Sequence, residues 1–338
     1  MPSEHHKPRV GLVVDATDHF LQPMEQALRE RFHVSRFAPR FIKAPVVGMS
    51  VNKLLFHLQF RRFLASHDVA FFEWAGSLLV QATHMPKRCR IVTRLHSMEV
   101  ASAAHRVDWS QVDATIVVSE QMKQRLLLAA KAPPPYIQII NYGIDLSRFH
   151  FTQKPFRHRV GMIARVVPVK RVYEAVLVIY ELRRRGYPFT LAVGGPLGDE
   201  LEPRYPWAIR ELIERLDLAK HVSLLGLISD PASLYAEIDV FLSNSFWEGQ
   251  QNSLIEAMAS GCYCLSHCWG GAEEVLPPEQ IFITDSELQA KLVAYASLSE
   301  PEKAARQNRM RTLAETKFSV RDMERRVVQL IEKLRWSS

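Results

Sequence analysis

Residues 243–261 read SNSFWEGQQNSLIEAMASG and follow the apolar run Asp239–Leu242. The second half of the stretch is rich in helix formers and stops at Gly261, as a helix with a glycine cap does. The pattern therefore predicts a buried strand, a loop and a helix. Free amides at the start of such a helix attract anions, whereas the flanking carboxylates of Glu248 and Glu256 suit sugar hydroxyls. Together they indicate a ligand that carries both kinds of group.

The two glutamates are separated by seven residues, and EAMASG closes the pattern. This E-x7-E stretch resembles the donor-site signature of retaining glycosyltransferases of the GT-B fold, in particular family 4. The resemblance implies an α/β protein with two Rossmann-like, doubly wound domains that face a central cleft. It also implies a hexosyltransferase-type enzyme of glycan biosynthesis that moves a sugar from a UDP- or GDP-sugar to a hydroxyl of a glycan, lipid-linked or small-molecule acceptor. Two glutamates at this spacing also arise by chance, so motifs elsewhere in the chain have to support the resemblance.

The chain has 338 residues, which is more than one hydrophobic core comfortably serves. Its 47% hydrophobic and 23% charged residues are typical of a globular protein. We expect a Rossmann-like acceptor-side domain over residues 1–150 and a Rossmann-like nucleotide-sugar-binding domain over residues 151–318. The resemblance implies that residues 319–338 form a helix that crosses back to the first domain.

No apolar run is long enough to span a bilayer, and the start, MPSEHHKPRV, lacks the apolar core of a signal peptide. We therefore expect a cytoplasmic protein whose four cysteines are reduced. Cys262, Cys264 and Cys268 cluster beside His267, but their spacing fits no common zinc motif. The sequence also has no Asp-x-Asp cluster to hold a divalent ion. We predict a site without metal or cofactor, in which the nucleotide sugar is a substrate.

The first half of the chain has the strand–helix–strand rhythm of a doubly wound domain. Val10–Val14 is predicted to be its first buried strand, and Met24–Phe32 has helical spacing. A later strand, Arg90–Leu95, ends at His96, which is where open α/β sheets bind ligands. The segment VTRLHSMEV resembles the family's strand end whose histidine faces the donor sugar. Asn141–Asp145, NYGID, resembles the family's N-G-V-D turn at the end of the first domain.

In the second half, the strand Arg159–Ala164 leads to Arg165 and Lys170, two cations suited to a leaving diphosphate. Gly194–Gly195–Pro196 and Gly226 match the family's G-G-P and F-L-G strand ends, the second of which lies against the nucleobase. The resemblance implies that Glu248, His96, Arg165 and Lys170 are catalytic. The implied donor-binding set is Arg165, Lys170, Gly194, Gly195, Gly226, Leu227, Glu248, Gly249, Asn252, Ser253, Leu254 and Glu256. Within it, Glu256 would accept from the ribose and Glu248 from the transferred sugar.

The sequence departs from the family pattern at four places. The loop after the first strand, Asp15–Phe20, has no glycine, which puts a contact from this loop to the donor phosphate in doubt. Arg171 replaces a glycine that often follows the lysine. Asn244 stands where a proline is usual, and Gln250 where a phenylalanine is usual, so the sugar that is held could differ.

Other functions stay open at this point. A GT-B scaffold that binds a nucleotide sugar or a partner enzyme without turnover fits the same motifs. An epimerase or a phosphorylase would share the fold, but neither has its own signature here. There is no G-x-G-x-x-G after the first strand and no P-loop, which speaks against a dehydrogenase or a P-loop enzyme. No recognised nucleic-acid module is present either.

The net charge of +7 is unevenly spread, because no acidic residue occurs between Glu30 and Asp68. The predicted helix Val51–Leu64 in this segment carries Lys53, His57, Arg61 and Arg62 beside many apolar residues. The family contains members that meet the membrane through such a helix. One expectation is therefore that the protein binds peripherally to the anionic inner face of a membrane. The alternative is that the apolar face packs into the domain while the cations face water or an acidic acceptor.

Overall fold

The computed structural model describes residues 7–17, 21–41, 48–198 and 202–335, and it divides into two compact units. The first unit contains Met1–Asn141 and Arg321–Ser338, and the second contains Tyr142–Val320. The first unit thus ends at Asn141 and not at residue 150. The reason is that Ile144 and Phe149 pack into a core cluster of the second unit.

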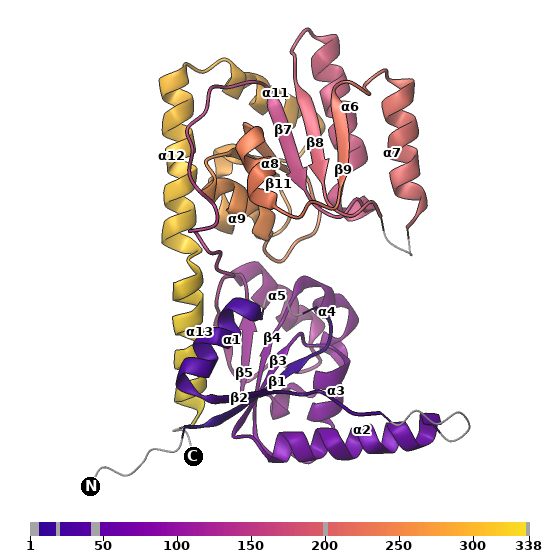
Figure 1. The fold of residues 1–338 in the computed structure, drawn as a ribbon, viewed down its shortest axis with the longest axis vertical. Coiled ribbons are helices and arrows are strands. Elements are labelled where there is room, and N and C mark those ends of the chain that lie inside the picture. The colour runs from indigo at the N-terminus through magenta and orange to yellow at the C-terminus, as the bar shows by residue number, and fades with distance from the viewer. Residues whose placement is uncertain (1–6, 18–20, 42–47, 199–201, 336–338) are drawn as a thin grey trace. The chain divides into compact units, whose positions relative to one another are not determined.

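The first unit is built around a six-stranded parallel sheet with the order β2-β1-β3-β4-β5-β6. Helices cover both faces of this sheet (Figure 1). The strands are β1 (Arg9–Val14), β2 (His33–Arg36), β3 (Val69–Glu73), β4 (Arg90–Arg94), β5 (Ala114–Val117) and β6 (Ile137–Ile139). The helices are α1 (Gln22–Arg31), α2 (Gly48–Ala65), α3 (Ser77–Thr83), α4 (Ser97–Ser102), α5 (Glu120–Ala129) and α13 (Val320–Arg335).

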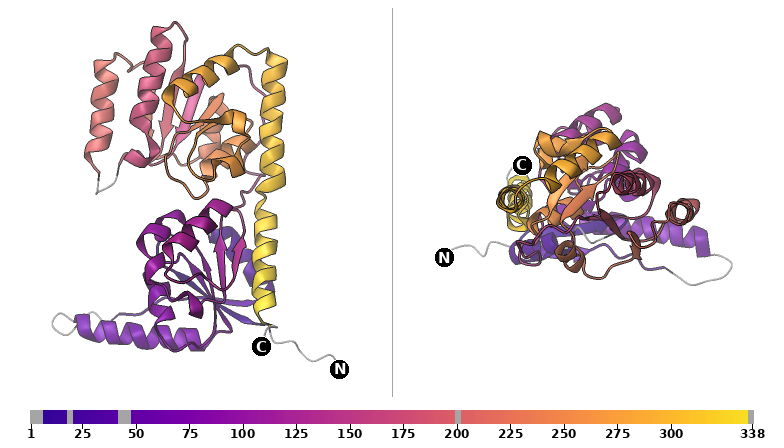
Figure 2. Two further views of the ribbon diagram at one scale, coloured as in Figure 1. Left: turned by 180° about the vertical axis from the view of Figure 1, so that it is seen from behind. Right: turned by 90° about the horizontal axis from the view of Figure 1, so that it is seen from above.

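The second unit repeats this architecture with the parallel strand order β12-β11-β10-β7-β8-β9 (Figures 1 and 2). Its strands are β7 (Arg159–Ile163), β8 (Thr190–Gly194), β9 (Val222–Gly226), β10 (Val240–Ser243), β11 (Tyr263–His267) and β12 (Ile281–Phe282). Its helices are α6 (Val172–Arg184), α7 (Arg204–Arg215), α8 (Pro231–Glu237), α9 (Asn252–Ala259), α10 (Ala272–Val275), α11 (Asp285–Ala296) and α12 (Glu300–Lys317).

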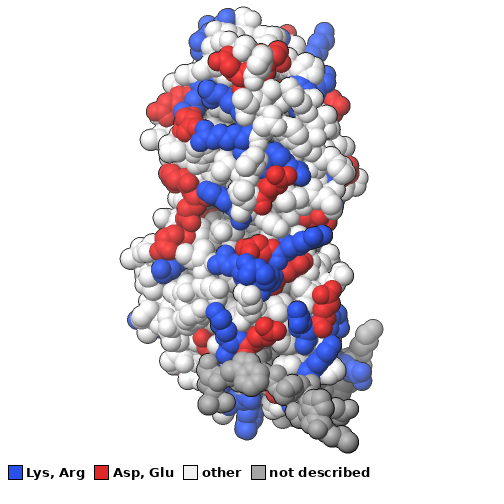
Figure 3. Space-filling model, turned by 90° about the vertical axis from the view of Figure 1, so that its left-hand side faces the viewer, with Lys and Arg blue, Asp and Glu red and all other residues white. Residues whose placement is uncertain are grey.

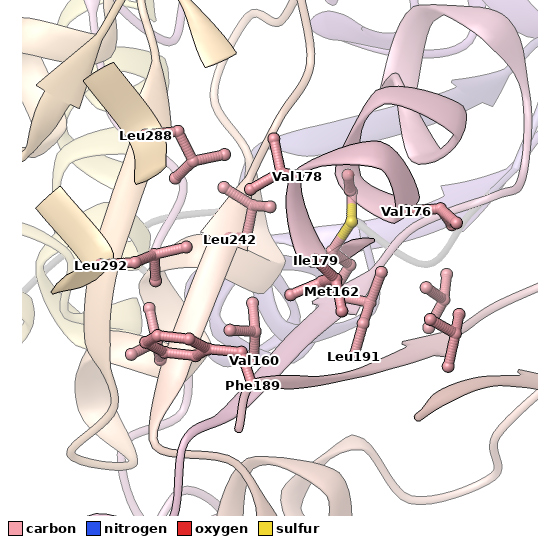
Figure 4. Close-up of a cluster of buried hydrophobic side chains, with 14 of the residues drawn as sticks. Val160, Met162, Val176, Val178, Ile179, Phe189, Leu191, Leu242, Leu288 and Leu292 are labelled. Atoms are coloured by element: carbon pink, nitrogen blue, oxygen red, sulfur yellow. The ribbon is translucent and has the colours of Figure 1, made fainter. Parts of the chain in front are cut away.

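Apolar side chains of the second sheet interlock with those of its helices. Met162 of β7, Leu191 of β8 and Leu242 of β10 lie in one buried cluster with Ile179 of α6 and Leu288 of α11 (Figure 4). Buried parallel strands need apolar residues on both faces, which explains why these segments appear in the sequence as short continuous apolar runs. The predicted doubly wound α/β architecture is confirmed in both units.

Helix α2 is partly packed and partly exposed. Phe60 and Leu64 are buried, whereas Leu54 and Leu58 are 62% and 54% exposed. Lys53, Arg61 and Arg62 are also exposed, whereas His57 is half-buried and its imidazole contacts Gln81 of α3. In the part of the chain that the structure describes, no helix is long and apolar enough to cross a membrane.

Candidate active site

The predicted donor-site loops meet at one point of the second sheet. A doubly wound sheet binds its ligand beyond the carboxyl ends of the strands, where the strand order reverses. That reversal lies between β7 and β10. Strand β7 leads into the loop with Arg165 and Lys170, and β10 leads into the loop with Glu248. The two loops touch, since the Phe246 amide donates to the Val169 carbonyl at 3.1 Å.

Lys170 and Glu248 form an ion pair across these two loops. The exposed fractions of their side chains are 20% and 12%, so the pair is largely shielded from water. Gly249, the next residue, is buried, whereas Arg165 is exposed at the start of its loop. The structure thus brings together one cation predicted for the phosphates and the carboxylate predicted for the sugar.

The glycine-rich strand ends close the same edge of the sheet. Gly195 has a φ of +135°, and a Cβ placed on it would lie 2.1 Å from the Ala164 carbonyl oxygen, so no other residue fits. Its amide donates to the Gly226 carbonyl at 2.7 Å, and the Ala164 amide donates to the Gly194 carbonyl at 2.9 Å. These hydrogen bonds connect the carboxyl ends of β7, β8 and β9. Leu227, which is 80% exposed, follows β9.

Helix α9 begins with Asn252, Ser253 and Leu254, as predicted. The Ser253 hydroxyl donates to the Ile163 carbonyl at the end of β7, with 3.0 Å between the two oxygens. This contact fixes the start of the helix beside the strand that leads to the two cations. Within the first turn, the Leu254 amide donates to the Gln251 carbonyl at 3.1 Å.

Glu256 lies one turn further along α9 and is held by a tyrosine. The Tyr235 hydroxyl donates to Glu256 Oε2 at 2.8 Å and also contacts the Ser253 carbonyl at 3.1 Å. Tyr235 itself is fully buried. Burial raises the pKa of Glu256, while the Tyr235 hydrogen bond and the charge of Arg148 act in the opposite direction. Nothing in the sequence pattern singles out Tyr235, because its position on α8 looks like an ordinary core position.

Three residues that depart from the family pattern form hydrogen bonds or an ion pair in the structure. Gln250 forms two hydrogen bonds with the backbone of Tyr142, accepting from its amide at 3.1 Å and donating to its carbonyl at 3.0 Å. Asn244 donates to the Arg171 carbonyl at 2.8 Å. Arg171 has a φ of +51°, which suits the glycine it replaces, and its guanidinium pairs with Asp285 at 2.9 Å.

Several buried polar atoms near this edge have no hydrogen-bond partner among the residues that the structure describes. They are Asn244 Oδ1, Ser245 Oγ, Asn252 Oδ1 and His267 Nδ1. Asn244 and Ser245 follow β10, His267 is the last residue of β11, and Asn252 begins α9. Unsatisfied buried polar atoms are rare and mark functional sites more often than ordinary core. Ser245 and His267 were not predicted as site residues, since neither belongs to the glutamate pattern.

His96 lies in the first unit, between β4 and α4, in a buried polar cluster. Its Nε2 is 2.8 Å from Glu73 Oε1, and Arg94 also donates to Glu73, from Nη2 at 2.8 Å. Glu73 is the last residue of β3 and is fully buried. Burial opposes the charge on Glu73, but Arg94 and His96 lower its pKa. Burial lowers the pKa of His96, and the charge of Arg94 acts in the same direction, whereas Glu73 opposes both.

The imidazole of His96 is covered by Trp74. The two rings stack with their centroids 3.8 Å apart, and the Trp74 indole donates to the Thr17 carbonyl at 2.8 Å. Trp74 has a φ of +84°, an uncommon conformation for so large a residue and one found mostly at functional sites. Asp15, from the loop without glycine, accepts from the Ser77 hydroxyl at 2.9 Å and from the Leu78 amide at 3.0 Å at the start of α3. Residues 18–20 of this loop lie outside the described residues.

Residues 157–297 match the family model described as Glycosyl transferases group 1. The match covers less than half of the chain and lies within the second unit. The chain as a whole has the GT-B fold, as in HepE from Anabaena, whose structure in complex with UDP and glucose gives a TM-score of 0.79. That comparison covers 97% of this chain and 100% of HepE, with 17% sequence identity.

Curated relatives are also glycosyltransferases. One of them, a subunit of the phosphatidylinositol N-acetylglucosaminyltransferase of Homo sapiens, is 25% identical over 181 residues, which are 52% of this chain and 36% of that protein. The MMP alpha-(1->4)-mannosyltransferase of Mycolicibacterium hassiacum is 27% identical over 173 residues, which are 50% of this chain and 40% of that protein. The chain therefore spans less than half the length of these two relatives.

Proposed function

We propose that this protein is a group 1 glycosyl transferase that moves a sugar from a nucleotide-diphosphate sugar to an acceptor hydroxyl, with retention and without a metal ion. The observation that carries the proposal is the ion pair between Lys170 and Glu248 at the reversal point of the second sheet. A cation for phosphate and a carboxylate for hydroxyls are adjacent there. The structural likeness to HepE, which binds UDP and glucose, supports a donor of this chemical class.

Different residues of the second unit would bind different parts of the donor. Arg165, Lys170 and the first amides of α9 would hold the diphosphate, where negative charge grows as the sugar leaves. Glu256 would accept from the ribose hydroxyls, and Glu248 from a hydroxyl of the sugar. Because Glu248 shares its carboxylate with Lys170, the sugar and the phosphate would be positioned by one connected pair.

The transfer step follows from this division. The bond from the anomeric carbon to the diphosphate oxygen breaks, and the acceptor oxygen bonds to that carbon on the same face. The acceptor proton passes to the departing phosphate oxygen, so no covalent intermediate on the protein is required. His96 is proposed to face the donor sugar, with Glu73 fixing the orientation of its imidazole.

Turnover of the donor separates this function from that of a non-catalytic sugar-nucleotide binder. The full chain is mixed with UDP- and GDP-sugars, and release of UDP or GDP to water is measured, with Glu248→Gln as the test variant. Glu211→Gln, an exposed position on α7, is the matched control. We expect release by the wild type and the control, and a loss of at least about 10²-fold in Glu248→Gln. Binding without release in the wild type would favour the non-catalytic alternative.

Association with an anionic membrane surface is a second part of the proposal. The supporting observation is that α2 exposes Leu54 and Leu58 together with Lys53, Arg61 and Arg62. Vesicles of neutral lipid and of mixed neutral and anionic lipid are floated with the protein at low salt. Leu54→Ser/Leu58→Ser should reduce recovery with anionic vesicles. If the protein instead stays equally in the unbound fraction with both lipids, membrane association is excluded and an acidic soluble acceptor is favoured.

A further inference from the structure

A cavity of about 650 Å³ lies at the amino edge of the first sheet. Arg9, Val69 and Arg90, which begin β1, β3 and β4, line it. His96 and Glu73 follow or end strands of the same sheet at its opposite, carboxyl edge. The cavity is therefore separate from the polar cluster around His96 and plays no part in the proposed sugar transfer.

The lining of this cavity is strongly basic. Its basic side chains are Lys7, Arg9, His67, Lys87, Arg88 and Arg90, against a single lining acid, Asp68. On the face of the protein in Figure 3, by contrast, positive and negative side chains are interspersed. Ion pairs link Arg311 with Glu315 on α12 and Arg325 with Asp322 on α13. A concave surface of one sign focuses its field on an ion of the other sign.

Internal ion pairs neutralise only part of this charge. Asp113 pairs with both Lys87 and Arg90, each at 2.8 Å. Asp68 accepts from the Arg9 amide at 2.8 Å and lies 3.8 Å from the Arg9 guanidinium. Two acids, Asp68 and Asp113, are thus shared among three cations.

Two further cations have no acid beside them among the described residues. The Lys7 ammonium donates to the Glu30 carbonyl at 3.2 Å, which leaves its charge uncompensated. Arg88 has no hydrogen bond or ion pair with any residue that the structure describes. The described lining of the cavity therefore keeps a surplus of positive charge.

The remaining lining does not compete for an anion. Val69 and Ile331 are buried and apolar, and they form part of the wall. Burial raises the pKa of the Cys89 thiol to about 11, so it carries no negative charge at neutral pH. A guanidinium offers two parallel donors that match two oxygens of a phosphate, and a lysine adds a compact charge. The volume is in the usual range for a small-molecule site.

We propose that the cavity lined by Lys7, Arg9 and Arg88 binds a phosphate group, either of a soluble phosphorylated molecule or of a phospholipid. The adjoining helix is compatible with the second source. Helix α2 ends at Ala65, just before His67 and Asp68 of the cavity wall, and it exposes Leu54 and Leu58 along its length.

The test compares charge-matched variants of the full chain. Arg9→Gln/Arg88→Gln removes two cavity cations, and Arg204→Gln/Arg215→Gln removes two exposed cations of α7. Both pairs are placed in an Arg165→Ala/Lys170→Ala background, so that the proposed diphosphate site does not bind the probe. Equilibrium dialysis measures radiolabelled inorganic phosphate. Flotation measures binding to vesicles of phosphatidylcholine with and without phosphatidic acid. Circular dichroism confirms that each variant is folded.

We expect the cavity variant to bind inorganic phosphate at least about tenfold more weakly than the α7 variant. If it also loses recovery with phosphatidic acid vesicles, the lipid headgroup is the source. If vesicle recovery is unchanged, the source is a soluble phosphorylated molecule. Equal phosphate affinity in the two variants would overturn the site. Donor turnover is measured separately without the background substitutions, so failure of the cavity and failure of the sugar transfer are distinguishable.

Discussion

The contact between Tyr235 and Glu256 allows the proposed ribose site to be tested by affinity. Glu256→Ala removes a charge-assisted contact, which should weaken UDP or GDP by about 1.5–3 kcal/mol, roughly 10- to 150-fold in Kd. Tyr235→Phe keeps the fully buried ring and removes only the hydroxyl that holds Glu256 Oε2 at 2.8 Å. We expect this smaller change to cost about 0.5–1.5 kcal/mol of binding free energy, because the carboxylate remains but is less well oriented.

The assignment of Glu256 to the ribose also predicts how nucleotide affinity changes with pH. Ribose hydroxyls donate to the ionised carboxylate, and burial raises the pKa of Glu256. Nucleotide affinity should therefore fall as pH decreases through this raised pKa. The Tyr235 hydrogen bond stabilises the charged form, so Tyr235→Phe should move the loss to higher pH. Glu256→Gln has no carboxylate to titrate, and its affinity should not show this step.

Isothermal titration calorimetry with UDP, GDP and their 2′-deoxy counterparts measures these effects from acid to neutral pH. Glu211→Ala, at an exposed position on α7, is the control. If Glu256 contacts the ribose, its removal should also shrink the preference for the ribonucleotide over the deoxynucleotide. A folded Glu256→Ala variant with wild-type affinity and preference would refute the assignment of Glu256 to the ribose.

Three further predictions concern catalysis and stability. Arg165→Ala and Lys170→Ala should each lower turnover by about 10²-fold or more, with smaller effects on donor binding; wild-type turnover in both would place the diphosphate elsewhere. Activity in excess EDTA should equal that in magnesium, and a loss restored by manganese would contradict a metal-independent site. Burial raises the pKa of Glu99 from 4.5 to about 7, so the wild type should lose stability as pH rises through this window. Relative to the wild type, Glu99→Gln should gain about 3 kcal/mol of unfolding free energy between the two values, and a pH-independent difference in denaturation would contradict this.

The strands and loops of the second unit could be predicted because buried parallel strands leave a simple signal. Each is a short apolar run that stops at glycine or at a polar loop, as Arg159–Ile163 and Val240–Ser243 do. The reversal of strand order then places the loops after β7 and β10 side by side. The adjacency of Lys170 and Glu248 thus follows from the topology, although their direct ion pair does not.

Contacts between distant side chains could not be predicted in this way. Tyr235 and Glu256 are on different helices, and the pairing of Glu73 with Arg94 and His96 joins two strands. The sequence shows His57 as one of four basic residues of the predicted helix Val51–Leu64, but not that Gln81 of a neighbouring helix is its partner. Such contacts depend on how elements pack, and a single sequence carries no direct record of that packing.

The loop that carries Glu248 shows how this chain can depart from the family pattern and still hold its carboxylate in place. A proline would restrict the backbone before the loop, and a phenylalanine after it would anchor the loop through apolar burial. Asn244 instead ties the start of the loop to the Arg171 carbonyl, beside Lys170, and Gln250 ties its end to the Tyr142 backbone. Both ties are hydrogen bonds to main chain, which depend on donor and acceptor geometry more than on volume. Glu248 lies between them, so its approach to Lys170 is fixed from both sides of the loop.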